Sequence, residues 1–249
     1  MTEALLCVRG LTRTFGAVRA SDALDLDVRA GELHAVIGPN GAGKSTLIGQ
    51  LTGEIRPDAG SVRFDGLELR HLPVHQRARL GVARSFQVSS VFPGLSALDN
   101  VALAAQAHAG HSFRFWQAVS RETALVERAR AELARVGLAG RAEVRAGALA
   151  HGEQRQLELA MVLAGRPRLL LLDEPMAGLG SEEVQRLSDL LQSLKRILTI
   201  VLVEHDMDVV FSLSDRITVL IFGRNIVTGP PETIRASDEV RRAYLGTAA

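Results

Sequence analysis

The stretch GPNGAGKST at residues 38–46 constrains the fold of this chain more than any other feature. It fits the pattern G-x-x-x-x-G-K-[ST] of a phosphate-binding loop. The apolar run LHAVIG at residues 33–38 leads into it and predicts a buried strand, and residues 45–53 have the periodicity of a helix. A strand, a glycine-rich loop and a helix in this order are the context that the motif requires, so the sequence predicts a nucleotide site. The alternative is a glycine-rich turn without a ligand, but the full pattern in this context rarely arises by chance.

Each residue type in the loop has a chemical reason. Glycine lets the backbone approach phosphate oxygens, and the N–H groups at the start of the helix form a concave anion site. Lys44 offers a point charge to the β- and γ-phosphates, and the Ser45 hydroxyl is placed to bind Mg²⁺. The residues expected to hold the nucleotide are Asn40, Gly41, Ala42, Gly43, Lys44, Ser45 and Thr46.

Polar residues also end three other predicted strands. RLLLLDEP at residues 168–175 ends in two carboxylates, and ligands in open α/β sheets bind at the carboxyl ends of strands. We therefore expect Asp173 to hold Mg²⁺ through water and Glu174 to polarise the attacking water. His205, at the end of IVLVEHD, can donate a hydrogen bond to the γ-phosphate, and the Gln87 amide, at the end of VARSFQ, can bind Mg²⁺ and water. The alternatives are solvated acids at a strand end and a structural histidine, and Gln87 alone would carry no weight.

The pattern along the chain predicts an α/β fold with a mostly parallel sheet, an antiparallel flank and an inserted helical part. Residues 4–8 and 22–28 alternate apolar and polar residues, as antiparallel strands do. Strand signals vanish from about residue 92 to 160, where Ala, Arg and Glu recur with helical periodicity. We expect one domain over residues 1–249, with a core formed by 1–91 and 161–249 and a helical subdomain at about 92–160.

Finer elements follow from local signals. A helix over residues 181–196 is predicted to be capped by Ser181, a hairpin to turn around Gly223-Arg224-Asn225, and a last helix to span residues 231–246.

Composition narrows the function classes. The net charge is +1, so no global field recruits nucleic acid. The apolar runs at residues 169–172 and 197–203 are too short to span a bilayer, and the N-terminus does not resemble a signal peptide. Cys7 is the single cysteine and is expected to be a small buried apolar residue. If the protein serves a membrane process, we expect it to act from the aqueous side.

The stretch GALAHGEQRQ at residues 147–156 predicts a loop that begins a helix. Ala150 takes the natural capping position but has no hydroxyl. The N–H groups of His151, Gly152 and Glu153 and the helix dipole remain able to hold an anion. Without the rest of the chain, an ordinary helix start would be the better interpretation.

Together these features resemble the ATP-binding subunits of ABC transporters over nearly the whole chain. The resemblance depends on Phe15, the phosphate loop, Gln87, LAHGEQR, LLLLDEP, AGLG at residues 177–180 and His205. Further stretches resemble the ATPases of high-affinity branched-chain amino acid importers, a group with relatives for urea, amides and other small polar solutes. These stretches are GVARSFQ, VFPGLSALDNV, EPMAGL, VEHDMDVVFSLSDRITVL and the terminal AYLG.

The resemblance implies a P-loop NTPase core of the RecA type, with ATP and Mg²⁺ as ligands and ATP hydrolysis coupled to transport. Phe15 would stack on adenine, Gln87 would couple the nucleotide site to the membrane subunit, and His205 would sense the γ-phosphate. Lys44 and Glu174 would complete the catalytic set. Ala150, His151, Gly152 and Glu153 would close on the ATP held by a second subunit, and Gly178 to Gly180 would follow the dimer interface.

Two positions depart from the pattern of the family. Ala150 stands where many members have Ser, and Gly180 stands where Asp or Asn is usual. Both positions belong to the half of the site that faces the second subunit. Loss of one capping hydroxyl costs about 0.5–2 kcal/mol, so we expect a working loop.

The partners implied by the resemblance are a second ATPase subunit (a copy or a paralogue), two permease subunits and, indirectly, a periplasmic-type solute-binding protein. The protein would lie at the cytoplasmic face of the membrane as a peripheral subunit. One alternative is an exporter ATPase of the lipopolysaccharide type. A remoter one is a DNA-repair, chromosome-organising or ribosome-associated ATPase, whose long insertions, zinc modules or second cassette do not fit in 249 residues.

Overall fold

The N-terminal residues form the predicted antiparallel flank as a four-stranded sheet in the order β2-β1-β4-β5. The structure is a computed structural model that describes residues 4–85, 91–108, 123–195, 197–238 and 240. The strands are β1 (Ala4–Phe15), β2 (Val18–Arg29), β4 (Ala59–Phe64) and β5 (Leu67–Glu68). β1 and β2 are longer than the alternating runs predicted from the sequence. Their pairing shifts register at several points, which interrupts the period of two on which the prediction depends.

A six-stranded sheet in the order β10-β9-β3-β8-β7-β6 forms the centre of the molecule. β3 pairs in parallel with β8 and β9, and β7 pairs in parallel with β8 and β6, so the predicted, mostly parallel sheet is confirmed. Its strands are β3 (Leu33–Ile37), β6 (Val82–Arg84), β7 (Leu169–Asp173), β8 (Thr199–Val203), β9 (Arg216–Ile221) and β10 (Arg224–Gly229). β3, β7 and β8 are buried along their whole length, as their continuous apolar runs predicted.

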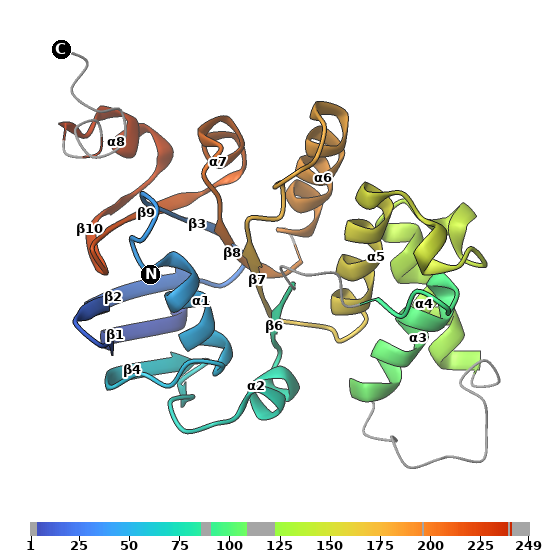
Figure 1. Cartoon of the computed structure of the whole chain (residues 1–249), viewed down its shortest axis with the longest axis horizontal. Helices are drawn as coiled ribbons and strands as arrows, with labels where there is room; N and C mark the ends of the chain where they lie inside the picture. Colours follow the sequence, from blue (N-terminus) through green and yellow to red (C-terminus); the bar gives the residue numbers. More distant parts are fainter. Residues whose placement is uncertain (1–3, 86–90, 109–122, 196, 239, 241–249) are drawn as a thin grey trace.

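The helices connect and cover these strands (Figure 1). They are α1 (Lys44–Thr52), α2 (Val74–Leu80), α3 (Ala97–His108), α4 (Thr123–Arg135), α5 (His151–Leu163), α6 (Ser181–Leu194), α7 (Met207–Leu213) and α8 (Pro231–Ala236), with short 3-10 turns at Ala139–Arg141 and Ala146–Ala148.

Three local predictions were wrong in detail. The capping residue of α6 is Gly180, and Ser181 is the first helical residue. The hairpin between β9 and β10 turns at Phe222 and Gly223, both with positive φ, so that Arg224 and Asn225 already belong to β10. α8 ends at Ala236, because Ser237 has an extended backbone, and Asp238 and Val240 are helical again; residues 239 and 241–246 of the predicted last helix lie outside the described residues.

The central sheet has a hydrophobic cluster on each face. Leu170, Leu172, Ile200 and Leu202 join a cluster that includes buried residues of α3, α4 and α5. Leu169, Leu171, Val201 and Val203 point to the other face, into a cluster shared with α1 and the antiparallel sheet. The alternation of a strand thus connects the helical part and the antiparallel flank to the same sheet.

The three helices of the predicted helical part, α3, α4 and α5, lie together on one side of the molecule (Figure 1). α5 continues past residue 160 to Leu163 and packs on both α3 and α4. The division of the chain into a core and a helical subdomain stays a prediction. Cys7 is partly exposed rather than fully buried. No helix in the described part of the chain combines the length and the apolar character that a membrane crossing needs.

Candidate nucleotide site

The ends of four neighbouring strands place the predicted polar residues at one edge of the central sheet. β3, β8, β7 and β6 are adjacent and parallel, so their carboxyl ends meet at the same edge. The phosphate loop follows β3, Asp173 ends β7 and His205 lies two residues after β8. Asp173 lies opposite Val203 in the pairing of β7 with β8. The structure therefore brings these residues to one edge, as the strand order required. Gln87 follows β6 in the sequence but lies outside the described residues.

The conformation of the phosphate loop depends on glycine. Gly43 caps α1 with a φ of 102°, in the left-handed region. A Cβ at this position would lie 2.2 Å from the carbonyl oxygen of Ala20 in β2, so a side chain is excluded by both backbone and space. The loop is also tied to the hairpin between β9 and β10, because Gly223 donates its N–H to the carbonyl of Ala42 over 2.9 Å.

A cavity of about 330 Å³ opens over this loop. It is lined by Val18, Ala20, Asn40, Gly41, Ala42, Gly43, Lys44, Ser45, Thr46 and Glu174. All the loop residues predicted to hold the nucleotide are therefore in its wall. The first turn of α1 contains no acidic residue, so the positive end of the helix dipole faces the cavity without a competing carboxylate of its own.

Lys44 is held inside the loop. Its Nζ donates to the carbonyl oxygens of Gly38 at 2.6 Å and Pro39 at 3.2 Å. Burial lowers the pKa of Lys44, while the charges of Glu174 and Asp173 act in the opposite direction. Lys44 therefore puts a cation beside the two carboxylates and beneath the cavity.

Asp173 has one oxygen bound and one oxygen open. Its Oδ2 accepts a hydrogen bond from Arg84 at 3.0 Å. Its Oδ1 is buried and has no hydrogen-bond partner in the part of the chain that the structure describes. Burial raises the pKa of Asp173, and the Arg84 cation opposes this rise. An unpaired buried oxygen needs a donor or a cation, so Asp173 fits a metal-bound water, and the exposed Ser45 in the first turn of α1 offers a hydroxyl ligand.

Glu174 has an unusual backbone. Its φ is +50°, in the left-handed region that non-glycine residues rarely adopt, and its N–H donates to Val203 over 2.8 Å. Such a conformation costs about 1–3 kcal/mol and tends to occur at functional sites. The bend directs the chain out of β7 at the point where Glu174 lines the cavity. The position fits the predicted base.

His205 lies beside a residue that sequence reasoning missed. Its side chain is 64% exposed, and its Nδ1 lies 3.7 Å from Glu204 Oε2. Glu204 is fully buried and accepts hydrogen bonds from the N–H groups of Met176 at 2.9 Å and His205 at 3.1 Å. This carboxylate therefore ties the segment after Glu174 to the end of β8. An acidic residue directly after a continuous apolar strand was the available signal.

Phe15 ends β1 and is 45% exposed. It pairs with Val18, which lines the cavity, but Phe15 itself is not among the lining residues. The Arg13 guanidinium lies 4.7 Å from the centroid of the ring and covers one face. The predicted stacking of Phe15 on adenine stays a prediction.

The residues predicted to face a second subunit form a separate site at the start of α5. Ala150 is the capping residue and makes no side-chain bond. Glu153 accepts from the N–H of Ala150 at 3.0 Å and from Arg141 at 2.8 Å, and the bond from Ala150 lowers the pKa of Glu153. His151 is exposed, and Gly152 faces Glu183 of α6 so closely that a Cβ would lie 2.1 Å from Glu183 Oε1.

A second cavity of about 310 Å³ lies at this site. Ala150, Gly152 and Glu153 line it together with Leu179 and Glu183, and it shares no lining residue with the cavity over the phosphate loop. In Figure 1, α1 lies to one side of β7 and β6 and α5 to the other. A single chain therefore does not bring the two predicted halves of the site together.

Comparisons with known proteins agree with this geometry. Residues 21–177 match a family described as "ABC transporter", and residues 224–249 match one described as "Branched-chain amino acid ATP-binding cassette transporter". The chain is 40% identical over 255 residues to BraF of Pseudomonas aeruginosa, a high-affinity branched-chain amino acid transport ATP-binding protein, with full coverage of both chains.

The chain is also similar to solved structures of ATP-binding cassettes. The ADP conformation of an ATP-binding cassette from an ABC transporter has a TM-score of 0.87 at 25% identity, covering 98% of this chain and 100% of that chain. A dimeric bacterial ABC transporter cassette has a TM-score of 0.77 at 25% identity, covering 91% of this chain and 98% of that chain.

Proposed function

Because the chain belongs to the ABC transporter family of ATP-binding proteins, we propose that it binds ATP with Mg²⁺ and hydrolyses it to drive the import of a solute. The family resemblance and the α/β fold predicted from the sequence are confirmed. The observation that carries the proposal is the cavity in which residues 40–46 and Glu174 meet at the edge of the sheet that also holds Asp173.

The residues divide the chemistry among them. Lys44 and the N–H groups at the start of α1 bind the phosphates. Ser45 and Asp173 hold Mg²⁺, which neutralises negative charge on the phosphate oxygens when it is bound. Glu174 accepts a hydrogen bond from the attacking water, and His205 donates one to the γ-phosphate. Gln87, which lies outside the described residues, would add an amide ligand for Mg²⁺ and the attacking water, as its place after β6 in the sequence predicts.

We also propose that hydrolysis needs a second ATPase subunit. The cavity over the phosphate loop and the cavity at the start of α5 have no lining residue in common, and the α5 cavity presents a helix N-terminus whose capping residue, Ala150, has no side-chain acceptor. A solved relative is a dimer of cassettes. A partner, either a copy or a paralogue, would place Ala150, His151, Gly152 and Glu153 against the ATP in the first cavity.

The transported solute is proposed from the relatives. BraF is a branched-chain amino acid transport protein, and residues 224–249 match a family of that description. We propose branched-chain or related amino acids as the solute, delivered by a periplasmic-type binding protein to two permease subunits. The chain would sit at the cytoplasmic face of the membrane. A groove of about 230 Å³ lined by α2, β6, α3 and α5 is a suitable surface for a permease, because its wall includes apolar residues such as Val74, Met161 and Val162.

The test is the substitution Glu174→Gln. The variant should bind a fluorescent ATP analogue as tightly as the wild type but lose about 100-fold or more of the ATPase rate, because the amide cannot act as a base. Glu182→Gln, on the exposed first turn of α6, is the matched control and should keep the full rate. Undiminished turnover of the Glu174 variant would refute the assignment of the base. Uptake of labelled leucine, isoleucine and valine by cells that carry either variant tests the solute.

A further inference from the structure

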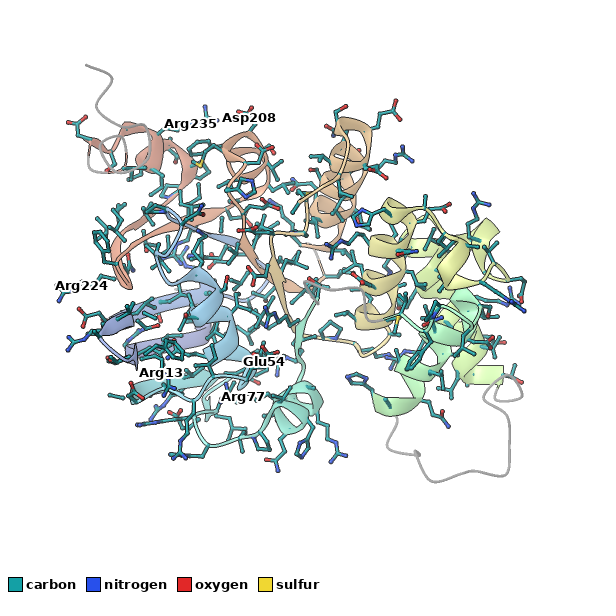
Figure 2. The ribbon with its side chains drawn as sticks, in the orientation of Figure 1. Arg13, Glu54, Arg77, Asp208, Arg224 and Arg235 are labelled. Carbon is teal, nitrogen blue, oxygen red and sulfur yellow. The ribbon has the colours of Figure 1, made fainter. Side chains whose placement is uncertain are left out.

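Arg84 connects two carboxylates that lie far apart in the sequence. It is the last residue of β6, and its side chain is 15% exposed. One terminal nitrogen, Nη1, donates to Glu54 Oε2 at 2.5 Å, and the other, Nη2, donates to Asp173 Oδ2 at 3.0 Å. Glu54 follows the C-terminal cap of α1, where Figure 2 labels it. A planar guanidinium with two fixed donors therefore bridges the end of the phosphate-loop helix and the end of β7.

The two carboxylates bound by Arg84 differ in burial. The side chain of Asp173 is 1% exposed, whereas that of Glu54 is 39% exposed. Asp173 needs a cation because an isolated carboxylate is costly to bury, and Arg84 is the cation that touches it. Lys44 acts on Asp173 by its charge but donates its hydrogen bonds to the phosphate loop. Arg84 therefore sets the direction of Asp173, because it holds Oδ2 and leaves Oδ1 open.

The outer end of the bridge reaches the groove described above. Glu54 and Arg84 both line it, beside the apolar residues of α2, α3 and α5 and one further carboxylate, Glu158. Glu54 and Arg84 are thus part of the wall of the groove, while Nη2 of Arg84 contacts Asp173. Within the described part of the chain, no second side chain that lines the groove donates a hydrogen bond to Asp173.

We propose that Arg84 is a positioning residue that orients Asp173 for Mg²⁺ and that Glu54 holds Arg84 in place, so that the groove and the metal site are coupled through one guanidinium. This inference rests on the proposed function, since it takes Asp173 as part of the Mg²⁺ site. Loss of the contact between Glu54 and Arg84 removes one of the two anchors of the guanidinium. Asp173 then loses its fixed orientation, and the affinity for Mg²⁺ with nucleotide falls.

The test measures nucleotide affinity rather than ATPase activity. A fluorescent ATP analogue is titrated with the full chain in excess Mg²⁺ and again in EDTA, and the ratio of the two affinities gives the gain due to Mg²⁺. Arg84→Met should reduce this gain about tenfold, as loss of a residue that orients a metal ligand commonly does, with the affinity in EDTA unchanged. Arg84→Lys keeps a cation for Asp173 but loses the two fixed donors of the guanidinium, so it should reduce the gain in affinity due to Mg²⁺ by a smaller factor.

Glu54→Gln imitates the loss of the outer anchor. We expect it to reduce the Mg²⁺ gain by about threefold in the wild-type background and to have no further effect in Arg84→Met, because Glu54 acts through Arg84. The matched control is Arg130→Met, which breaks the exposed ion pair with Glu143 and should leave the gain unchanged.

The outcomes separate this inference from the proposed function. If the wild type binds no nucleotide, or binds it without regard to Mg²⁺, the proposed function and the inference both fail. If the wild type shows the gain and Arg84→Met keeps it, only the inference is overturned. Additive effects of Glu54→Gln and Arg84→Met would overturn the coupling to the groove. Should Arg84→Met fail to fold, Arg84→Lys and Glu54→Gln decide the same question, because both retain a polar group at the bridge.

Discussion

Arg77 fixes the C-terminal end of α1, the helix that follows the phosphate loop, to α2. It lies on α2, is 2% exposed, and points its guanidinium at the C-terminal end of α1. Its Nη1 donates to the carbonyl oxygens of Gln50 at 2.7 Å and Leu51 at 2.9 Å, and its Nε donates to Leu72 at 2.9 Å. Figure 2 labels Arg77 at α2, near Glu54. One side chain thus satisfies two of the carbonyls that a helix end leaves unpaired.

The expected cost of Arg77→Met follows from these contacts. Methionine has a similar length but no donor, so two buried carbonyl groups, of Gln50 and Leu51, and the partly buried carbonyl of Leu72 lose a charged partner. A buried group left unpaired costs at least about 1 kcal/mol, so the two buried carbonyls predict a loss of about 2 kcal/mol in the free energy of unfolding, to which the partly buried carbonyl adds a smaller amount. Burial lowers the pKa of Arg77, so desolvation of the cation opposes part of the stabilisation that its hydrogen bonds provide.

Urea denaturation followed by circular dichroism measures this loss. Arg77→Met should lower the midpoint without changing the slope, and Arg77→Lys should fall between the variant and the wild type because it keeps one donor. Arg79→Met, at an exposed position of the same helix, is the control and should stay within about 0.5 kcal/mol of the wild type. A loss below about 1 kcal/mol for Arg77→Met would refute the reasoning, because the three contacts would then not stabilise the fold.

Three further changes test the two cavities. Gly43→Ala should lower nucleotide affinity at least about tenfold in a fluorescence titration, and by more than Gly41→Ala. Both glycines have a positive φ, but only at Gly43 would the Cβ meet another atom, the carbonyl oxygen of Ala20 at 2.2 Å. Ala150→Ser should change ATP-driven dimerisation, followed by size-exclusion chromatography, more than the ATP affinity of the monomer, and the reverse result would mean that the loop is misplaced. Glu153→Gln tests the lowered pKa of Glu153. The hydrogen bond from the N–H of Ala150 to the ionised carboxylate stabilises the fold at pH values above 4.5, the ordinary pKa of the group. This contribution disappears as the pH falls through the lower pKa that Glu153 has in the folded protein. The difference in unfolding free energy between wild type and Glu153→Gln should therefore shrink in acid, and a difference that stays constant from neutral to acidic pH would contradict this.

The parts of the site that the sequence predicted are those set by local order along the chain. The phosphate loop lies between β3 and α1, and the positions of Asp173 and His205 follow from the rule that parallel strands end at one edge. Ala150 was correctly predicted to be the capping residue of α5, because a helix start is also a local signal.

The residues that sequence reasoning missed act over long separations. Arg84 meets Asp173 across 89 positions of sequence, Arg77 meets Gln50 across 27, and Glu204 meets Met176 across 28. Each is a charged residue, a type whose side chain is usually solvated. Their burial becomes visible only when the strand order and the packing of α2 on α1 are known, because these determine which carbonyl or carboxylate lies within reach.

The two departures from the family pattern turn out to share one physical arrangement. Ala150 and Gly180 are the capping residues of α5 and α6, and neither has a side chain that can accept from the helix. In each helix the third residue supplies the reverse half of the cap: Glu153 accepts from the N–H of Ala150, and Glu183 accepts from the N–H of Gly180, both at 3.0 Å. Because the other carboxylate oxygen of Glu183 lies against Gly152, the starts of α5 and α6 are in direct contact. A change at Ala150 therefore acts on the segment before α6 as well as on its own helix, which is why dimer closure, and not ATP affinity in one chain, is the property to measure.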